Sequence, residues 1–238
     1  MRLSDFKVLS FDCYGTLIDW ESGIWAALQA LAMKAGGKER EAALIRFGHH
    51  ESAQERETPS LKYSALLSRV HARLAAEWGV AHNPVAAAVF GASVGDWPAF
   101  PDSAEALAYL KRHFKLVILS NVDGASFAGS NARLGVEFDA ICTAEDVGSY
   151  KPNPANFRYL LARLGEMGNK PRELLHVAQS LYHDHVPANA AGLSSAWIDR
   201  RAAAPGWGAT PEAAARYDFR FATLAELADA HRAEQAGR

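Results

Sequence analysis

The strongest constraint on the fold is a short, mainly apolar run, Val8 to Phe11, which ends in Asp12 and a turn of small residues. Such a run bounded by a turn is typical of a buried strand. In an open parallel α/β sheet, ligands lie outside the carboxyl ends of the strands, so an acid there faces substrate rather than core. Gly15 lets the backbone bend around the acid, and Thr16 brings a hydroxyl donor beside it. An Asp that only caps a turn is the alternative.

Three later segments have the same form, a strand-like run that breaks into polar residues. They are Lys115 to Ser120 followed by Asn121, the segment Ser149-Tyr150-Lys151-Pro152, and Leu174 to Ala178 followed by Gln179, Ser180 and Asp184. We therefore expect several polar side chains at strand ends and not a single isolated acid.

Strand and helix patterns alternate from residue 98 onward, which is typical of a parallel sheet with right-handed crossovers. Strands are expected at 115–119, 140–143, 174–178 and 195–198, and helices at 103–113, 125–134, 154–164, 186–191 and 224–231. Asp102 is expected to cap the first of these helices, and 200–210 to form a surface loop. The pattern predicts an α/β fold with a Rossmann-like parallel sheet.

Residues 18–97 show helical spacing only. Helices are expected at 20–35, 39–55, 60–78 and 83–94, and no strand pattern interrupts them. A series of helices between the first strand and the next is not a simple crossover. We therefore predict a helical cap domain at 18–97, inserted into an α/β core domain formed by 1–17 and 98–238.

The composition excludes several classes of protein. The chain has 238 residues, 49% of them hydrophobic and 22% charged, with a formal net charge of −2, which argues against disorder and against a nucleic-acid partner. No apolar stretch approaches about 18 residues, and Met1 to Lys7 lead almost directly into the first strand, so we expect a soluble cytoplasmic protein without membrane contacts. Cys13 and Cys142 are expected to be free thiols that pack. The sequence leaves a homodimer open.

The segments FDCYGTL, LSN and YKPNP together resemble the haloacid dehalogenase superfamily, whose four motifs are a nucleophilic Asp, a Ser or Thr, a Lys and an acidic loop. The resemblance covers the whole chain. It implies Asp12 as the nucleophile, Ser120 and Lys151 in the second and third motifs, and Asp184 in the acidic loop. It also implies a helical cap inserted just after the first motif. As an analogy, it directs attention to the site but does not derive the reaction.

These residue types suit covalent catalysis. A carboxylate nucleophile such as Asp12 forms an ester that water can later open. Ser120 and Asn121 can donate hydrogen bonds to an anionic group or a departing atom, or they can cap the following helix. The positive charge of Lys151 can keep Asp12 ionised, unless Lys151 is simply solvated. Asp184 is the candidate for orienting the water, with a helix cap as the alternative.

Two residues that are not acids decide between phosphoryl transfer and reaction at carbon. Superfamily phosphatases normally have an Asp two residues after the nucleophile and Asp ligands in the fourth motif, where this chain has Tyr14 and Gln179. Magnesium prefers charged oxygen ligands, and Asp12 with Asp184 are too few to hold it well. We therefore predict no metal and no other cofactor. DCYGTL and YKP resemble the metal-independent type II 2-haloacid dehalogenases.

That resemblance implies a hydrolase whose Asp12 displaces halide from C2 of a 2-haloalkanoate, after which water hydrolyses the ester to a 2-hydroxy acid. The expected partner is thus a small anionic organic acid. The resemblance also implies that Arg46 of the cap and Asn121 receive the halide, although Arg46 also fits a solvent-facing position. Tyr14 offers an apolar ring with a polar tip to such a pocket.

The fourth segment departs from the family pattern. The better-known dehalogenases read Ser-Ser-Asn before a Trp-Asp pair, whereas here Tyr182 and His183 precede Asp184. The change leaves other carbon electrophiles open, such as a strained ring or a fluorinated acid. A magnesium-dependent phosphatase and a binding module without activity are further alternatives, and the intact nucleophile and lysine argue against the last. The expected substrate-binding and halide-binding residues are Tyr14, Arg46, Gln179, Ser180, Tyr182 and His183.

Overall fold

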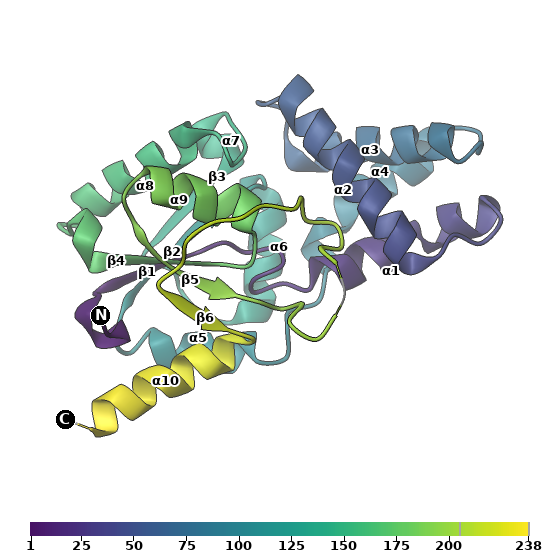
Figure 1. Ribbon diagram of the computed structural model, residues 1–238. Coiled ribbons are helices and arrows are strands. Elements are labelled where there is room, and N and C mark those ends of the chain that lie inside the picture. The colour runs from purple at the N-terminus through teal and green to yellow at the C-terminus, as the bar shows by residue number, and fades with distance from the viewer. Residues whose placement is uncertain (205, 238) are drawn as a thin grey trace.

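The computed structural model describes residues 1–204 and 206–237, and at its centre is a six-stranded sheet whose neighbouring strands are all parallel. The strand order is β3-β2-β1-β4-β5-β6 (Figure 1). The strands are β1 (Val8–Phe11), β2 (Lys115–Ser120), β3 (Ala140–Thr143), β4 (Leu174–Ala178), β5 (Ser194–Ile198) and β6 (Phe219–Phe221). The predicted α/β class with a Rossmann-like parallel sheet is confirmed.

Helices cover both faces of this sheet, with α8 and α9 on one side and α5 and α10 on the other (Figure 1). The helices of this part are α5 (Ser103–Leu110), α6 (Gly124–Leu134), α7 (Ala144–Val147), α8 (Pro154–Glu166), α9 (Val186–Ala190) and α10 (Leu224–Ala236). Short helical turns are η1 (Leu3–Asp5), η3 (Pro171–Glu173) and the π-helical η4 (Leu181–His185).

Successive residues of the central strands pack into two different cores. Val8 and Val117 lie in one cluster with Phe157 of α8, whereas Leu9 and Leu116 lie in the cluster on the opposite face. Successive side chains of a strand point to opposite faces, and a parallel sheet is buried on both. Burial of each such side chain contributes about 1.5–3 kcal/mol, so these two cores hold the strand ends in fixed positions.

The helices between β1 and the return to the core lie together at one side of the sheet (Figure 1). They are α1 (Trp20–Lys34), α2 (Arg40–Glu57), α3 (Tyr63–Glu77), α4 (Pro84–Ala92) and the turn η2 (Ser93–Asp96). The outgoing and returning chains run side by side, because Ile18 forms an antiparallel bridge with Ala99 and the N–H of Phe100 donates to the carbonyl of Leu17. We propose residues 18–97 as the cap.

Asp102 is the N-cap residue of α5, as predicted, but its side chain does not cap that helix. Instead, Oδ2 accepts from the backbone N–H groups of Leu224 and Ala225 at the start of α10, and Oδ1 accepts from Arg200 at 2.8 Å. The side chain thus stabilises the N-terminus of a helix distant in sequence, which local spacing cannot reveal.

Other differences concern short elements. The strand β6, the helix α7 and the π-helix η4 were not predicted, because a strand of three residues and helices of about one turn show no periodic pattern. Both cysteines are free and buried, as predicted. Among residues 1–204 and 206–237, no helix is long and apolar enough to cross a bilayer.

The segment predicted as a surface loop, 200–210, is only partly one. Ala209 and Thr210 are 2% and 6% exposed, and residue 205 lies outside the described residues. Gly48 of α2 lies directly against this segment, since a Cβ at position 48 would come within 1.9 Å of the carbonyl oxygen of Ala209. Glycine is therefore required where the cap meets the core.

We expect Gly48→Ala to destabilise the protein by about 1–3 kcal/mol, because the added methyl forces α2 away from the core segment. The measurement is the free energy of unfolding in urea. Gly165→Ala, near the end of α8, is the matched control and should be neutral or slightly stabilising, because the added methyl would meet no neighbour within 4 Å. Equal stability of the two variants would contradict a close packing at Gly48.

Candidate active site

A small cavity of about 40 Å³ lies where residues following β1, β2 and β4 meet helices of the cap. Since one water occupies about 10–15 Å³ on this measure, the cavity admits only a small ligand. Its lining consists of Asp12, Tyr14, Trp20, Glu51, Glu55, Tyr63, Asn121, Val122, Lys151, Gln179, Ser180, His183, Asp184 and Thr210.

Asp12 directly follows β1 and is held from both sides. Its N–H donates to the carbonyl of Val177, and the Thr16 hydroxyl donates to Asp12 Oδ2 at 2.7 Å. Thr16 Oγ1 in turn accepts from the N–H of Gln179 at 2.9 Å. Gly15 between them has φ +93°, and a Cβ there would lie 3.1 Å from the Gln179 side chain. The turn therefore needs glycine, and it fixes the carboxylate at the cavity wall.

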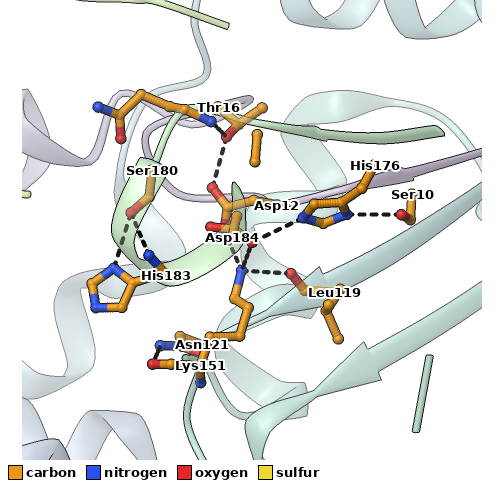
Figure 2. Close-up of polar contacts among 12 residues, drawn as sticks. Ser10, Asp12, Thr16, Leu119, Asn121, Lys151, His176, Ser180, His183 and Asp184 are labelled. Carbon is orange, nitrogen blue, oxygen red and sulfur yellow. Dashed lines mark hydrogen bonds and ion pairs between the residues drawn. The ribbon is translucent and has the colours of Figure 1, made fainter. Parts of the chain in front are cut away.

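Lys151 is buried, which excludes the solvated alternative. Its Nζ donates to Asp12 Oδ1 at 2.9 Å, to Asp184 Oδ1 at 2.7 Å and to the carbonyl of Leu119 at 3.0 Å (Figure 2). Burial would lower the pKa of Lys151, but the two carboxylates outweigh it and raise that pKa above its usual range. All three N–H donors of the ammonium are used within the protein.

The same ammonium acts on the two acids. Burial raises the pKa of Asp12, and the charge of Lys151 and the Thr16 hydroxyl oppose that rise. Burial would also raise the pKa of Asp184, but Lys151 and His176 hold it well below its usual range. Asp184 is thus a stable anion, and its Oδ2 has no hydrogen-bond partner among the described residues. This oxygen can accept a hydrogen bond from a ligand or a water, whereas the predicted helix-cap alternative is not realised.

Sequence reasoning missed a buried pair behind Asp184. His176 of β4 contacts Asp184 Oδ1 through Nε2 at 3.0 Å and Ser10 through Nδ1 at 2.8 Å. Ser10 and His176 are paired positions of the neighbouring strands β1 and β4. A Ser and a His inside two otherwise apolar strands were the signal that could have revealed this contact. The pair fixes the orientation of Asp184.

Neither Ser120 nor Asn121 caps α6, and Asn121 has another role than the one predicted. Asp123, not either of them, caps α6 by accepting from the N–H of Ser126. Ser120 is buried, its Oγ has no partner among the described residues, and it does not line the cavity. Asn121 Oδ1 accepts from the Lys151 N–H at 2.7 Å, and Nδ2 donates to the Lys151 carbonyl and to Glu55, both at 3.1 Å. Both amide hydrogens are used, so Asn121 positions Lys151 and has none left for a leaving group.

The fourth segment, residues 179–184, supplies some of the residues that line the cavity. Gln179 lines it, and its Oε1 accepts from the Thr210 hydroxyl at 3.2 Å. Ser180 Oγ accepts from the N–H of His183 and begins η4. His183 also lines the cavity, and burial lowers its pKa to about 4, so the ring is neutral. Tyr182 does not line this cavity but a neighbouring groove, so its predicted contact with substrate is not supported.

Tyr14 contributes its ring to the cavity, as expected, but not its polar tip. The hydroxyl lies 2.8 Å from Ser130 Oγ of α6, and the ring packs edge-on against Trp97. Burial raises the pKa of Tyr14 well above its usual range, so the side chain stays neutral. It therefore forms an apolar wall.

The prediction for Arg46 is not supported. Arg46 is half-exposed, and its Nε and Nη2 donate to the two carboxylate oxygens of Glu77 at 2.7 and 2.6 Å. It is not part of the cavity lining. The buried face of α2 contains Leu44, Phe47 and Glu51, and Arg46 lies off this face. The spacing along the chain suited a halide-binding arginine, but the helix turns that position outward.

Instead of an arginine, α2 supplies two buried acids that sequence reasoning missed. Glu51 and Glu55 are 4% and 7% exposed and both line the cavity. Glu51 accepts from the Tyr63 hydroxyl, and burial raises its pKa to about 7. Burial and the charge of Glu51 raise the pKa of Glu55 well above its usual range. The sequence feature that could have revealed their burial is their four-residue spacing, which continues the spacing of the apolar residues of α2.

No three His, Cys, Asp or Glu side chains in the described part of the chain are grouped so that they could hold a metal ion. The space between Asp12 and Asp184 holds the ammonium of Lys151.

The model of the haloacid dehalogenase-like hydrolase family matches residues 6–192. The L-2-haloacid dehalogenase PA0810 shares 24% identity over 96% of this chain and 99% of its own, with a TM-score of 0.75. The L-2-haloacid dehalogenase from Xanthobacter autotrophicus with chloropropionic acid covalently bound shares 20% over 95% and 98%, with a TM-score of 0.77.

A third similar structure is the HAD-hydrolase YfnB from Bacillus subtilis bound to magnesium, with 18% identity over 95% of this chain and 97% of its own, and a TM-score of 0.74. At these identities the three structures show a shared fold. A search of curated proteins finds no match.

We expect Lys151→Ala to lower kcat by about 10²–10³-fold, on the order of 3 kcal/mol, as for the removal of other preorganised donors. The variant also leaves two buried carboxylates unpaired, so it should be less stable. Because protons neutralise unpaired carboxylates, its deficit in unfolding free energy should be larger at pH 8 than at pH 5. Steady-state kinetics and urea unfolding at both pH values measure these effects. A kcat within a few-fold of wild type would show that the ammonium does not act on Asp12.

Proposed function

The chain belongs to the haloacid dehalogenase-like hydrolase family, and we propose that it hydrolyses a small organic acid at a saturated carbon through a covalent ester of Asp12. The observation that carries this proposal is the Lys151 ammonium between Asp12 and Asp184. The charge of Lys151 favours the ionised form of Asp12 against the effect of burial, and the ammonium bridges one oxygen of each carboxylate. The substrates that we propose first are 2-haloalkanoates.

In the first step, a carboxylate oxygen of Asp12 attacks C2 of the substrate, the new C–O bond forms and the bond to the leaving group breaks. The leaving group departs with the electron pair, as halide in a 2-haloalkanoate. Thr16 and Lys151 hold the carboxylate at 2.7 and 2.9 Å, so its orientation is fixed before the substrate arrives.

In the second step, water attacks the carboxyl carbon of the Asp12 ester and the bond between that carbon and the substrate oxygen breaks. One proton of the water goes to the departing oxygen to give a 2-hydroxy acid, the other leaves to solvent, and the carboxylate of Asp12 is restored. We propose that Asp184 Oδ2 orients this water, since the atom is unpartnered and Asp184 lines the cavity. His176 and Lys151 hold the other oxygen, Oδ1, so Oδ2 has a defined direction.

The leaving group meets different donors from those predicted. Arg46 lies outside the cavity, and Asn121 has no free amide hydrogen. Trp20 and Gln179 line the cavity, and each carries an N–H donor, Nε1 of the indole and Nε2 of the amide. We propose that these two groups receive the leaving group. Because the predicted halide contacts are replaced, a strained ring or a fluorinated acid that reacts through the same ester is the second candidate.

Phosphoryl transfer is not favoured by the charges of the cavity. Asp12, Asp184, Glu51 and Glu55 line it, and Lys151 is committed to the first two. A dianionic phosphate would bring twice the charge of a carboxylate next to two acids that already share one ammonium, so it would need a bound cation.

We expect turnover to continue in the presence of chelator, because Lys151 supplies the positive charge at Asp12 that a metal supplies in phosphatases. The measurement is initial rate on small 2-haloalkanoates after dialysis against chelator, with and without added Mg²⁺. A loss of rate in chelator that Mg²⁺ restores would contradict the proposed role of Lys151.

A single turnover in ¹⁸O-labelled water, with enzyme in excess, should place the label on the carboxyl group of Asp12 and not in the product. In the ester route the first product oxygen comes from Asp12, and the configuration at C2 is inverted by one in-line displacement. Mass spectrometry of the Asp12 peptide and chiral chromatography of the product test this. Label in the first-turnover product with an unlabelled Asp12 peptide would make Asp12 a general base.

A further inference from the structure

We propose that this site selects substrates that carry a protonated amine close to the reacting carbon, and that Glu51 and Glu55 bind the ammonium group. The inference rests on the proposed function, since it names the substrate class for the same Asp12 site. It assigns a role to two buried acids that the ester mechanism does not use.

Both acids come from one face of α2 and share the cavity with the nucleophile. They are four residues apart and are 4% and 7% exposed. Each uses one oxygen within the protein, because Glu51 Oε1 accepts from Tyr63 and Glu55 Oε1 accepts from Asn121 at 3.1 Å. Neither Oε2 accepts a hydrogen bond from a described residue. Two carboxylate oxygens are therefore available to a ligand.

No charged side chain of the described residues donates a hydrogen bond to this pair, although the charges of Lys151 and Arg56 act on Glu55 from a distance and oppose the rise of its pKa. Lys151 uses its three donors on Asp12, Asp184 and a carbonyl. His183 Nε2 is 3.9 Å from Glu55 Oε2, and the ring is neutral because burial lowers its pKa to about 4. Buried carboxylates without a cation are unfavourable. An ammonium ion supplies the missing charge and the missing hydrogen bonds.

The unpartnered groups of the cavity also indicate a ligand. Asp184 is buried and lines the cavity, yet its Oδ2 has no partner among the described residues. Trp20 and Tyr63 contribute aromatic rings to the same lining, and aromatic faces attract cations. A contact between cap and core needs only the bond from Asn121 to Glu55, whereas Glu51 bonds to Tyr63 within the cap and makes no contact of that kind.

The size of the cavity limits the substrate. At about 40 Å³, the cavity leaves room for only a few atoms between the ammonium and the carbon that Asp12 attacks. The chemical class is therefore a short acid with a leaving group at C2 and an amine at the far end. The cap acids hold the amine, and the core residues perform the displacement.

The test compares ligands that differ only in an ammonium and a methyl group. For binding without reaction, we use 4-aminobutanoate and pentanoate in isothermal titration calorimetry. For turnover, we use 4-amino-2-chlorobutanoate and 2-chloropentanoate. At pH 8, where Glu51 with its pKa of about 7 is mostly ionised, the amine should bind and react at least about tenfold better than its methyl counterpart.

Glu51→Gln and Glu55→Gln should each lower the amine-to-methyl ratio by about tenfold or more. Glu57→Gln is the matched control, because Glu57 lies on the same helix but is exposed and pairs with Arg73. Both ligands are measured on the same variant, so a partial loss of folded protein cancels in the ratio.

The outcomes separate this inference from the proposed function. Amine selectivity that depends on Glu51 and Glu55, without turnover of either chloro acid, would support the ammonium site and contradict displacement of halide by Asp12. Turnover of both chloro acids with equal efficiency would leave the ester route intact and overturn the ammonium site. Absence of binding of 4-aminobutanoate would also overturn it.

Discussion

The buried ammonium of Lys151 is the interaction on which the site depends. Its three acceptors come from the ends of β1 and β2 and from η4 after β4, so one cation joins three parts of the core. Asp12 and Asp184 could not both stay ionised side by side without it. A buried ion pair of this kind is weak evidence for net stability, since desolvation offsets the attraction. What it provides is a fixed geometry, and Asn121 extends that geometry by binding the backbone of Lys151 on both sides.

The sequence alone was sufficient to predict those site residues that come after strands or tight turns. Asp12, Lys151 and Asp184 each come after an apolar run or a tight turn, and a parallel sheet brings such ends to one edge. The two-sided burial of β1 makes its limits easy to recognise. A motif resemblance added roles to these residues. The sheet order places β1 between β2 and β4, so Asp12 lies next to the segments that supply the acceptors of Lys151.

The residues that were missed or misplaced depend on tertiary packing. Arg46, Glu51 and Glu55 all lie on α2, and only the rotation of that helix against the core decides which of them reach Asp12. A rotation of about 100° per residue moves a side chain off the cavity within one step along the chain. Hydrogen-bond partners are equally hidden, since Asn121 is satisfied by groups 30 and 66 residues away. Asp102 likewise serves a helix more than 120 residues further on.

The core and the cap differ in how the charges of their cavity residues are balanced. In the core, Asp12, Lys151 and Asp184 are linked to one another and to His176, so the chemistry there has its counterion within the fold. In the cap, Glu51 and Glu55 have hydrogen-bond donors but no counterion among the described residues. The negative charge of Glu51 and Glu55 can be neutralised by protons or by a cationic ligand. The ammonium of Lys151 does not serve this purpose, because it is bound to Asp12 and Asp184. The same Asp chemistry can therefore serve different substrates when the inner face of α2 changes, which is how one fold supports several activities.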